Sequence, residues 1–342
     1  MTSLVVQTAF LGDVVLTTPL LAALAERHGP VDVVTTPAAA PLLETHPAVR
    51  RVRAYDKRGR DRGLAGLLAL AGTLRAEGYE TAYLPHRSLR SALLARLARV
   101  PRRVGFHDGW RLLYTDVKRR PATGHEIDRL LALADVKPHH QTPPVLVTTL
   151  SDRTAAERVL RDGGVAAGGT FVALAPGSIW GSKRWPYYAE LAGRLAPRVA
   201  VVVVGGAEDR ALGDAIVAAV RQACPERSEG AVNACGQLSL RESAALIGKA
   251  AALVTNDSAP LHFAAAAGTP TVALFGPTLP AFGFGPRGPR DVALGVDGLS
   301  CRPCSRHGPP RCPLGHHHCL RHLLLEQVVA ALEETGALHR RD

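Results

Sequence analysis

The chain of 342 residues is too long for one ordinary hydrophobic core and fits two α/β domains of about 150 residues each. Hydrophobic residues make up 46% and charged residues 21%, which excludes a disordered chain, and no apolar run reaches the roughly 18 residues of a membrane span. The net charge of +11 favours an anionic partner (nucleic acid, lipid headgroups or a phosphorylated substrate), unless it reflects ordinary solvated basic faces.

The first half alternates short apolar strands with helices. Its strand-like start at residues 3–8 has no basic region and no cleavage site, so we expect no signal peptide and a cytoplasmic protein. A turn with Gly12 and Asp13 leads into an apolar helix over 14–27. Further strands are expected at 31–35, 51–55, 81–84 and 103–106, and helices near 39–45, 63–77 and 88–99. This alternation predicts a parallel, doubly wound sheet.

A Pro- and His-rich segment over 137–150 separates this half from the next, so we place the domains at 1–150 and 151–342. The second half repeats the alternation, and Ser239 with Glu242 forms a capping box at the start of a short helix. Residues 226–230 are expected to form a surface insertion. The predicted strands are 171–175, 199–204, 250–255 and 271–275, and the predicted helices lie near 151–161, 187–195, 209–221, 239–248, 259–267 and 321–334.

The segment from Thr255 to His262 is the most informative part of the chain. It follows an apolar strand and precedes an Ala-rich helix that ends at Gly268. An acid (Asp257), a hydroxyl (Ser258) and a histidine therefore lie between the carboxyl end of a strand and the amino end of a helix. Open α/β sheets bind ligands at that edge, where helix N–H groups favour phosphate. The alternative is that Asp257 and Ser258 merely cap the helix.

Three other turns place polar side chains at strand ends. Asp13 either caps the following helix or removes a proton from a bound hydroxyl. The loop from Pro176 to Trp185 offers two serines and Lys183 to a diphosphate, unless it is an ordinary basic turn. It matches neither G-x-x-x-x-G-K-[ST] nor G-x-G-x-x-G, which argues against a nucleoside triphosphatase and a nicotinamide dehydrogenase. In the turn over residues 206–209, an acidic side chain (Glu208 or Asp209) either binds ribose hydroxyls or caps a helix.

Four of the six cysteines have the spacing C-x2-C-x7-C-x6-C in the Cys/His-rich loop, residues 300–322. In a reducing cytosol this spacing argues for a metal before a disulfide, and four thiolates suit a structural zinc. Packed or redox-labile thiols and a disulfide are the alternatives. The expected zinc ligands are Cys301, Cys304, Cys312 and Cys319, with His307, His316, His317, His318 and His322 as substitutes.

Taken together, these segments resemble the ADP-heptose:lipopolysaccharide heptosyltransferases of glycosyltransferase family 9, particularly the heptosyltransferase II branch. The matching segments follow one another in the family's order. They are Leu11 to Pro19, Pro176 to Ser178 with Lys183 to Pro186, Val254 to Ser258 with Pro260 to His262, Phe275 to Thr278, and Cys312 to His317.

The resemblance implies a GT-B architecture, in which two Rossmann-like, doubly wound parallel-sheet domains face a central cleft. Residues 1–150 would bind the acceptor and residues 151–342 the nucleotide sugar. The implied activity is an inverting transfer of heptose from ADP-heptose to the phosphorylated, lipid-linked inner core of lipopolysaccharide, at the cytoplasmic face of the inner membrane. Since the sequence has no Asp-x-Asp motif, we expect no cofactor in catalysis. Without aromatic residues among the basic runs, we expect no nucleic-acid partner.

By position in the family's motifs, Asp13 corresponds to the proposed general base, Lys183 to the lysine on the donor phosphates, and Asp257 to the acid that holds sugar hydroxyls. Ala259 stands where the family usually has glycine. Its methyl group leaves less room for a phosphate to approach the backbone. One sequence does not decide whether Glu208 or Asp209 contacts the ribose. The remaining expected donor residues are Ser178, Ser182, Ser258, Pro260 and His262, and the expected acceptor residues are Gly12, Arg58, Arg60, Arg87 and Arg90.

Two alternatives stay open at this point. The first is another GT-B enzyme, either a transferase of a UDP- or GDP-sugar or a sugar-nucleotide epimerase. The second is a non-catalytic scaffold whose cysteines hold zinc and whose basic face binds nucleic acid or anionic lipid. The joint presence of Asp13, Lys183, Asp257 and His262 favours an enzyme.

Overall fold

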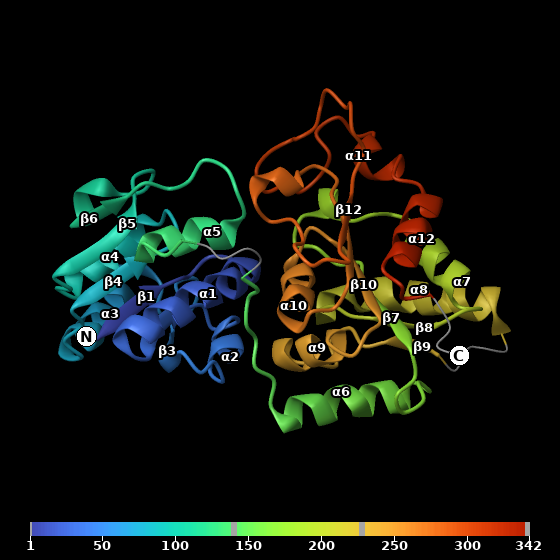
Figure 1. Ribbon diagram of the computed structural model, residues 1–342, viewed down its shortest axis with the longest axis horizontal. Helices are drawn as coiled ribbons and strands as arrows, with labels where there is room; N and C mark the ends of the chain where they lie inside the picture. The colour runs from blue at the N-terminus through green and yellow to red at the C-terminus, as the bar shows by residue number, and fades with distance from the viewer. Residues whose placement is uncertain (1, 138–141, 226–229, 339–342) are drawn as a thin grey trace. The chain divides into compact units, whose positions relative to one another are not determined.

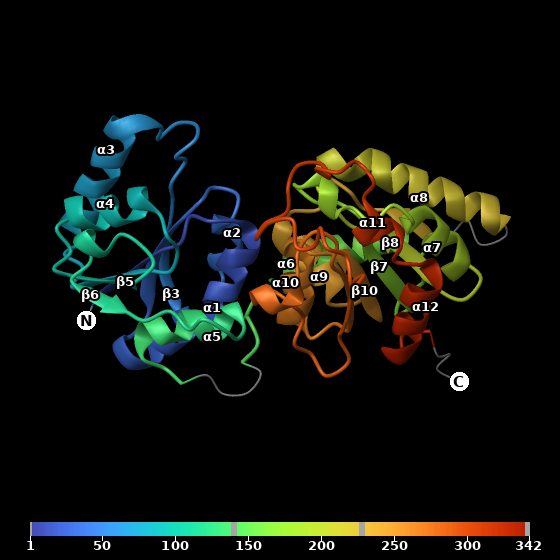
Figure 2. The ribbon, with the colours of Figure 1, turned by 90° about the horizontal axis from the view of Figure 1, so that it is seen from above.

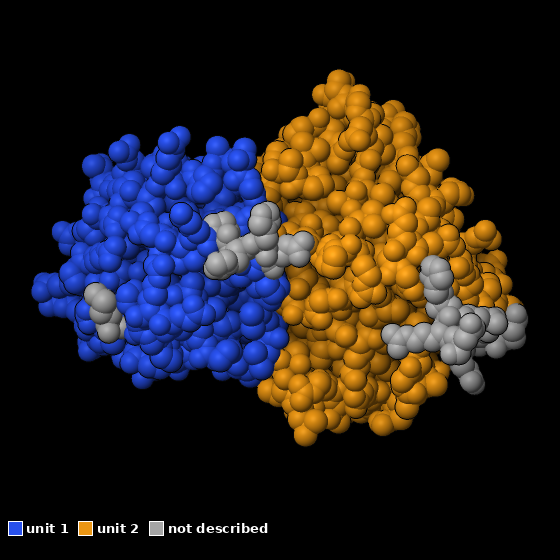
Figure 3. Space-filling view, viewed as in Figure 1, with its two compact units in different colours: residues 1–147 blue, residues 148–342 orange. Residues whose placement is uncertain are grey.

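The computed structural model describes residues 2–137, 142–225 and 230–338, and the chain divides into two compact units, residues 1–147 and 148–342 (Figure 3). The division falls just before helix α6 (Leu150–Asp162), which opens with a capping box. Thr149 Oγ1 accepts from Asp152 N at 3.1 Å, and Asp152 Oδ2 accepts from Thr149 N at 2.7 Å. Residues 138–141 of the expected connecting segment and 226–229 of the expected insertion lie outside the described residues.

Unit 1 contains a six-stranded parallel sheet with the order β3-β2-β1-β4-β5-β6. Every residue of β1, β2 and β4 is buried, because helices cover both faces of the sheet. Helices α3 and α4 lie on one side of it and α1 and α5 on the other (Figure 2). The strands are β1 (Ser3–Val6), β2 (Val31–Thr35), β3 (Val49–Ala54), β4 (Thr81–Leu84), β5 (Arg102–Phe106) and β6 (Asp116–Lys118), and the helices are α1 (Leu11–His28), α2 (Ala40–Leu43), α3 (Gly63–Ala76), α4 (Leu89–Leu97), η1 (Arg111–Leu113), α5 (Glu126–Leu131) and η2 (Ala132–Ala134).

Unit 2 contains a second six-stranded parallel sheet, with the order β12-β11-β10-β7-β8-β9 (Figure 1). Its core cluster packs against one face of the central strands, with Val172, Leu174, Val201 and Val254 among its buried side chains. The strands are β7 (Phe171–Ala175), β8 (Ala200–Val203), β9 (Ala231–Asn233), β10 (Ala252–Asn256), β11 (Thr271–Leu274) and β12 (Val292–Leu294). After α6, the helices are η3 (Gly181–Lys183), α7 (Tyr188–Leu195), η4 (Ala207–Asp209), α8 (Arg210–Ala223), α9 (Leu240–Ile247), α10 (Ala259–Ala267), η6 (Pro280–Phe282), α11 (His318–Arg321) and α12 (Leu325–Glu334).

Both sheets have the same doubly wound topology. In each, the first strand lies at the centre beside the fourth, and the chain moves outward in opposite directions from these two. Ligands bind doubly wound sheets at this switch point, beyond the carboxyl ends of the strands. The predicted pair of Rossmann-like parallel sheets is confirmed.

Some predicted elements have other boundaries in the structure. Helix α1 begins at Leu11 instead of residue 14, so Asp13 lies inside its first turn. The single helix expected over 321–334 is two, because α11 ends at Arg321 and α12 begins at Leu325. Strands β6, β9 and β12 were not predicted, since three residues are too few to show a period. Among the described residues, no helix has the length and apolar character needed to cross a membrane.

Candidate active site

The polar residues of unit 2 meet at the switch point of its sheet, where β7 and β10 pair in parallel. Asn256, at the end of β10, is fully buried. Its Nδ2 donates to Pro176 O at 2.9 Å, and its Oδ1 accepts from Trp185 N at 3.1 Å. This one side chain fixes the loop after β7 against the end of β10, at the edge where such sheets bind ligands.

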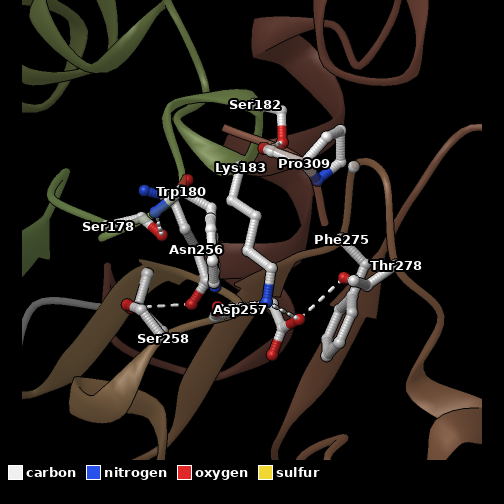
Figure 4. A network of polar contacts seen from close by, with 12 residues as sticks. Ser178, Trp180, Ser182, Lys183, Asn256, Asp257, Ser258, Phe275, Thr278 and Pro309 are labelled. Carbon is white, nitrogen blue, oxygen red and sulfur yellow. Dashed lines mark hydrogen bonds and ion pairs between the residues drawn. The ribbon is translucent and has the colours of Figure 1, made fainter. Parts of the chain in front are cut away.

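A buried ion pair joins the loops after β7 and β10. Lys183 ends the 3-10 turn η3, and its side chain is 10% exposed. Its Nζ donates to Asp257 Oδ2 at 2.6 Å and to Asp257 O at 3.2 Å, while Thr278 Oγ1 donates to the same carboxylate oxygen at 2.7 Å (Figure 4). Removing a charge from water is costly unless the charge is paired, and here each of the two groups is the partner of the other. The switch point therefore presents one ammonium and one carboxylate, held in fixed positions.

The Cys/His-rich loop closes around Lys183. Ser182 Oγ donates to Pro309 O, and His317 Nε2 donates to Ser182 O at 2.6 Å. Gly308 has a φ of +79°, and a Cβ added to it would lie 3.1 Å from Lys183 Cε. Glycine is required there both by the left-handed backbone and by the close approach of the lysine. The loop thus supports the ion pair directly.

Arg302 stabilises the turn that carries Thr278. Its side chain is 5% exposed, and its guanidinium lies against backbone carbonyl groups. An arginine that uses four of its five donors in this way fixes the backbone around it. The accepting oxygens are Gly276 O at 2.7 Å, Val296 O at 2.7 Å, Phe275 O at 3.0 Å and Thr278 O at 3.2 Å.

Ser258 and His262 belong to the start of α10. Ser258 occupies the N-cap position, but its side chain makes no capping hydrogen bond, and its Oγ lies 3.4 Å from Thr255 Oγ1. The alternative in which Ser258 serves as a helix cap is therefore not supported. Ala259 and Pro260 are half-buried in the first turn. His262 is buried, and burial lowers the pKa of its imidazole to about 4, so the ring is neutral at pH 7.

The two candidate ribose acids differ in exposure. Asp209 is buried, and its Oδ2 accepts from Gly206 N at 3.2 Å. A Cβ on Gly177 would collide with this carboxylate, so the acid lies tightly against the loop after β7. Burial raises the pKa of Asp209. Glu208 is exposed. In the loop after β7, Ser178 Oγ accepts a hydrogen bond from Trp180 N at 3.3 Å.

In unit 1, Asp13 is the third residue of α1, and its Oδ2 accepts from Phe10 N at 3.2 Å. The expectation that it immediately precedes the helix is wrong, because the turn from Leu11 to Asp13 is itself helical. A backbone hydrogen bond of this kind is compatible with either predicted role, since it uses one carboxylate oxygen. Gly12 lies beside it in the same turn.

Sequence reasoning missed a second polar cluster in unit 1, at its own switch point. Lys57 Nζ donates to Thr8 O at 2.7 Å and to Thr8 Oγ1 at 3.2 Å, and His86 Nε2 lies 3.3 Å from the same hydroxyl. Burial lowers the pKa of Lys57, with smaller contributions from Arg58 and Arg90. Burial and the nearby Lys57 lower the pKa of His86 to about 4. No short motif signals this cluster, since its members come from three separate loops.

The four expected acceptor arginines have different environments. Arg58 is exposed, and Arg60 lies 3.3 Å from Asp61. Arg87 lies 3.6 Å from Asp108. Arg90 instead holds the chain before α3: its guanidinium donates to the hydroxyl of Tyr55, to Asp61 O at 3.1 Å and to Gly63 O at 2.6 Å. Their acceptor role stays a prediction.

Residues 67–313 match the model of glycosyltransferase family 9 (heptosyltransferase). The chain belongs to this family. The matched range includes Lys183 and Asp257 and begins after Asp13. The protein is accordingly a glycosyltransferase, and the scaffold without catalytic activity is not supported.

Individual relatives of this glycosyltransferase agree with the family match. A lipooligosaccharide heptosyltransferase 2 from Haemophilus influenzae is 32% identical over 267 residues, which cover 74% of this chain and 76% of that protein. A lipopolysaccharide heptosyltransferase 2 from Escherichia coli K12 is 30% identical over 294 residues, covering 82% and 84%. Among solved structures, E. coli ADP-heptose lps heptosyltransferase II has a TM-score of 0.78 at 26% identity over 98% of both chains. A family 9 glycosyl transferase from Veillonella parvula has a TM-score of 0.84 at 25% identity, covering 98% and 96%. The predicted GT-B fold is confirmed.

In the part of the chain that the structure describes, the expected zinc ligands are not gathered into a metal-binding arrangement. All six cysteines are free thiols, so the disulfide alternative is wrong. Within the described ranges, no three or more His, Cys, Asp or Glu side chains are arranged to hold a metal ion. His316, His318 and His322 stack with ring centroids 3.9 and 4.3 Å apart, a parallel arrangement that does not direct their nitrogen atoms at one point. A zinc at Cys301, Cys304, Cys312 and Cys319 stays a prediction that metal analysis of the purified protein would test.

Proposed function

We propose that this glycosyltransferase moves heptose from ADP-heptose to the inner core of lipopolysaccharide, with inversion at the anomeric carbon. The observation that carries the proposal is the Lys183–Asp257–Thr278 network at the ends of β7 and β10. An ammonium suits the diphosphate of a sugar nucleotide, and a carboxylate held beside it suits sugar hydroxyls. The names of the relatives supply the sugar and the acceptor class.

In the proposed reaction, the acceptor hydroxyl oxygen attacks the anomeric carbon as Asp13 takes its proton. The bond between that carbon and the diphosphate oxygen breaks, and ADP leaves with the bonding pair. Lys183 stabilises the charge that develops on the departing diphosphate, with Ser182 beside it. Asp257 holds heptose hydroxyls, and its position depends on Thr278. No step uses a metal ion.

We assign the ribose contact to Glu208, which the sequence alone left undecided. Asp209 accepts a hydrogen bond from Gly206 and lies against Gly177, whereas Glu208 is exposed at the same strand end. Ser178, Ser258, Ala259, Pro260 and His262 would complete the nucleotide site. Since His262 is neutral at pH 7, it would contribute shape and a hydrogen bond, not charge.

For the acceptor side we propose Gly12, Arg58, Arg60, Arg87 and Arg90, and we add Lys57. Arg58 and Arg60 are exposed, and Lys57 donates to neutral oxygens of Thr8. Such cations suit a phosphorylated saccharide. An acceptor that is linked to lipid would place the enzyme at a membrane surface as a peripheral protein.

The test is release of nucleotide from ADP-heptose with and without an inner-core acceptor, in EDTA, beside UDP- and GDP-sugar controls. We expect ADP release that requires the acceptor and persists in EDTA. Release from UDP- or GDP-sugars alone would keep the fold and reject the heptose donor. Activity that EDTA abolishes would reject the mechanism without metal.

A further inference from the structure

Helix α3 of unit 1 has an apolar surface on the side that faces away from its sheet. From Gly63 to Leu74 it contains no charged residue. Its buried residues are Leu67, Ala71 and Leu74, which face the sheet, whereas Leu64 is 67% exposed and Leu68 49% exposed. A helix that is apolar all round is normally buried on every side. The outer side of α3 is therefore a surface that the described parts of the chain leave uncovered.

Neighbouring elements carry further exposed apolar side chains. Helix α4 packs against α3 on the same side of the sheet (Figure 2), and η1 contacts α4. Exposed apolar side chains in large contiguous patches mark interaction sites on soluble proteins. We define the α3 face by the exposed side chains of these three elements and the residue before η1: Leu64, Leu68, Leu89, Leu97, Trp110 and Leu112.

The α3 face is bordered by arginines. Arg62 and Arg75 lie at the two ends of α3, and three more follow on α4, after it and on η1. All five are exposed, and within the described ranges none of them forms an ion pair with a carboxylate. Leucine and tryptophan bordered by arginine are typical of protein surfaces that lie on anionic membranes. The five arginines are Arg62, Arg75, Arg96, Arg99 and Arg111.

We propose that the α3 face docks on the surface of an anionic phospholipid bilayer. Its leucines and Trp110 enter the headgroup region, and the bordering arginines contact lipid phosphates. A second copy of the chain fits this surface less well, because a symmetric contact would set the same arginines of both copies against each other. The proposal rests on and deepens the proposed function, since it names the surface by which the enzyme reaches a lipid-linked acceptor.

The experiment is co-sedimentation of the full chain with vesicles of phosphatidylcholine and phosphatidylglycerol, two parts to one, at low and high salt. We expect binding that high salt weakens and that vesicles of phosphatidylcholine alone largely lose. Leu64→Glu/Leu68→Glu should weaken binding at least tenfold. Arg62→Gln/Arg75→Gln, which leaves the apolar residues in place, should weaken it by roughly fivefold per charge. The control is Leu150→Glu at the start of α6, where an equally exposed leucine lies in unit 2; it should bind like the wild type.

Absence of wild-type binding to the anionic vesicles would overturn the proposal, as would unchanged binding by Leu64→Glu/Leu68→Glu. A double variant with a smaller molar mass in light scattering and intact vesicle binding would show that a second copy covers the face. A second assay distinguishes failure of the docking surface from failure of the proposed function. It measures ADP release on a soluble acceptor without acyl chains, which needs no membrane binding. We expect Leu64→Glu/Leu68→Glu to keep that activity and to lose transfer to acceptor embedded in vesicles. A wild type that binds vesicles but never turns over ADP-heptose would reject the function and leave the docking surface standing.

Discussion

The two units share one topology but present different charges at their switch points. In unit 2, Lys183 is paired with Asp257 at 2.6 Å, so the cation is neutralised before any ligand arrives. In unit 1, Lys57 donates to the two oxygens of Thr8, and the nearby His86 is neutral at pH 7. The shared sheet order determines where polar groups meet, whereas the side chains decide which charge a ligand encounters. In the proposed reaction, a donor phosphate would share Lys183 with Asp257, while an acceptor phosphate would meet a cation held by neutral groups.

The largest effect is expected where unit 1 supplies the proposed base. Asp13→Asn should lower turnover by roughly 10²–10⁴-fold, because the amide cannot accept the proton of the acceptor hydroxyl. The substitution keeps an oxygen that accepts from Phe10 N, so α1 should remain capped. Initial rates of ADP release would measure turnover, and a thermal melt would measure the stability of the fold. A variant with wild-type turnover would show that Asp13 serves α1 alone.

The next effect tests the paired cation of unit 2. Lys183→Met should lower kcat/KM for the donor by roughly 10²–10³-fold, because it removes the charge that stabilises the leaving diphosphate. It also leaves the carboxylate of Asp257 with Thr278 as its remaining side-chain partner, which we expect to destabilise the fold by about 3–5 kcal/mol.

A second substitution separates these two losses. Lys183→Met/Asp257→Asn removes both charges, so it should recover most of the free energy of unfolding while turnover stays low. Urea unfolding and donor titration on the three proteins would show this. Recovery of activity together with stability would mean that Lys183 acts through packing and not on the diphosphate.

Lys57→Met in unit 1 is the substitution that corresponds to Lys183→Met in unit 2. We expect about a tenfold rise in KM for a phosphorylated acceptor, the effect of one lost charge-assisted contact, with KM for the donor unchanged. The fold should tolerate the change better than Lys183→Met, since no carboxylate partner of Lys57 is found among the described residues. Steady-state kinetics with phosphorylated and dephosphorylated acceptors would measure it. An equal loss on both acceptors would contradict a phosphate contact.

The sequence was sufficient for features that depend on neighbouring residues. Apolar runs such as residues 31–35 and 171–175 became strands with the predicted bounds, and the polar turns after β7 and β10 do meet. Three-residue edge strands were missed because packing against the sheet, not local pattern, makes them strands.

The rest of the site depends on contacts between residues distant in the chain. Arg302 donates to a turn 26 residues earlier, and Lys57 contacts Thr8 from 49 residues away. Neither arrangement has a local signature. The cysteine spacing favoured zinc, yet in the structure the same loop contacts the ion pair through Gly308, Pro309 and His317. Spacing predicts which atoms are available, whereas three-dimensional packing decides which of them converge.

The smallest effect concerns the histidine at each switch point, the half-buried His86 in unit 1 and the buried His262 in unit 2. His86 and His262 both have a folded-state pKa of about 4, below the ordinary 6.5, because burial disfavours the imidazolium. As pH falls below 6.5, the unfolded chain binds protons first, so stability is constant above that pH and is lost progressively between 6.5 and 4. Each histidine should cost about 1 kcal/mol between pH 7 and pH 5.5. Urea unfolding at these two pH values should show that His86→Gln and His262→Gln each remove about that much of the pH dependence. If substituting one of these two histidines leaves the pH dependence unchanged, its switch point admits water, and the two units differ in hydration as well as in charge.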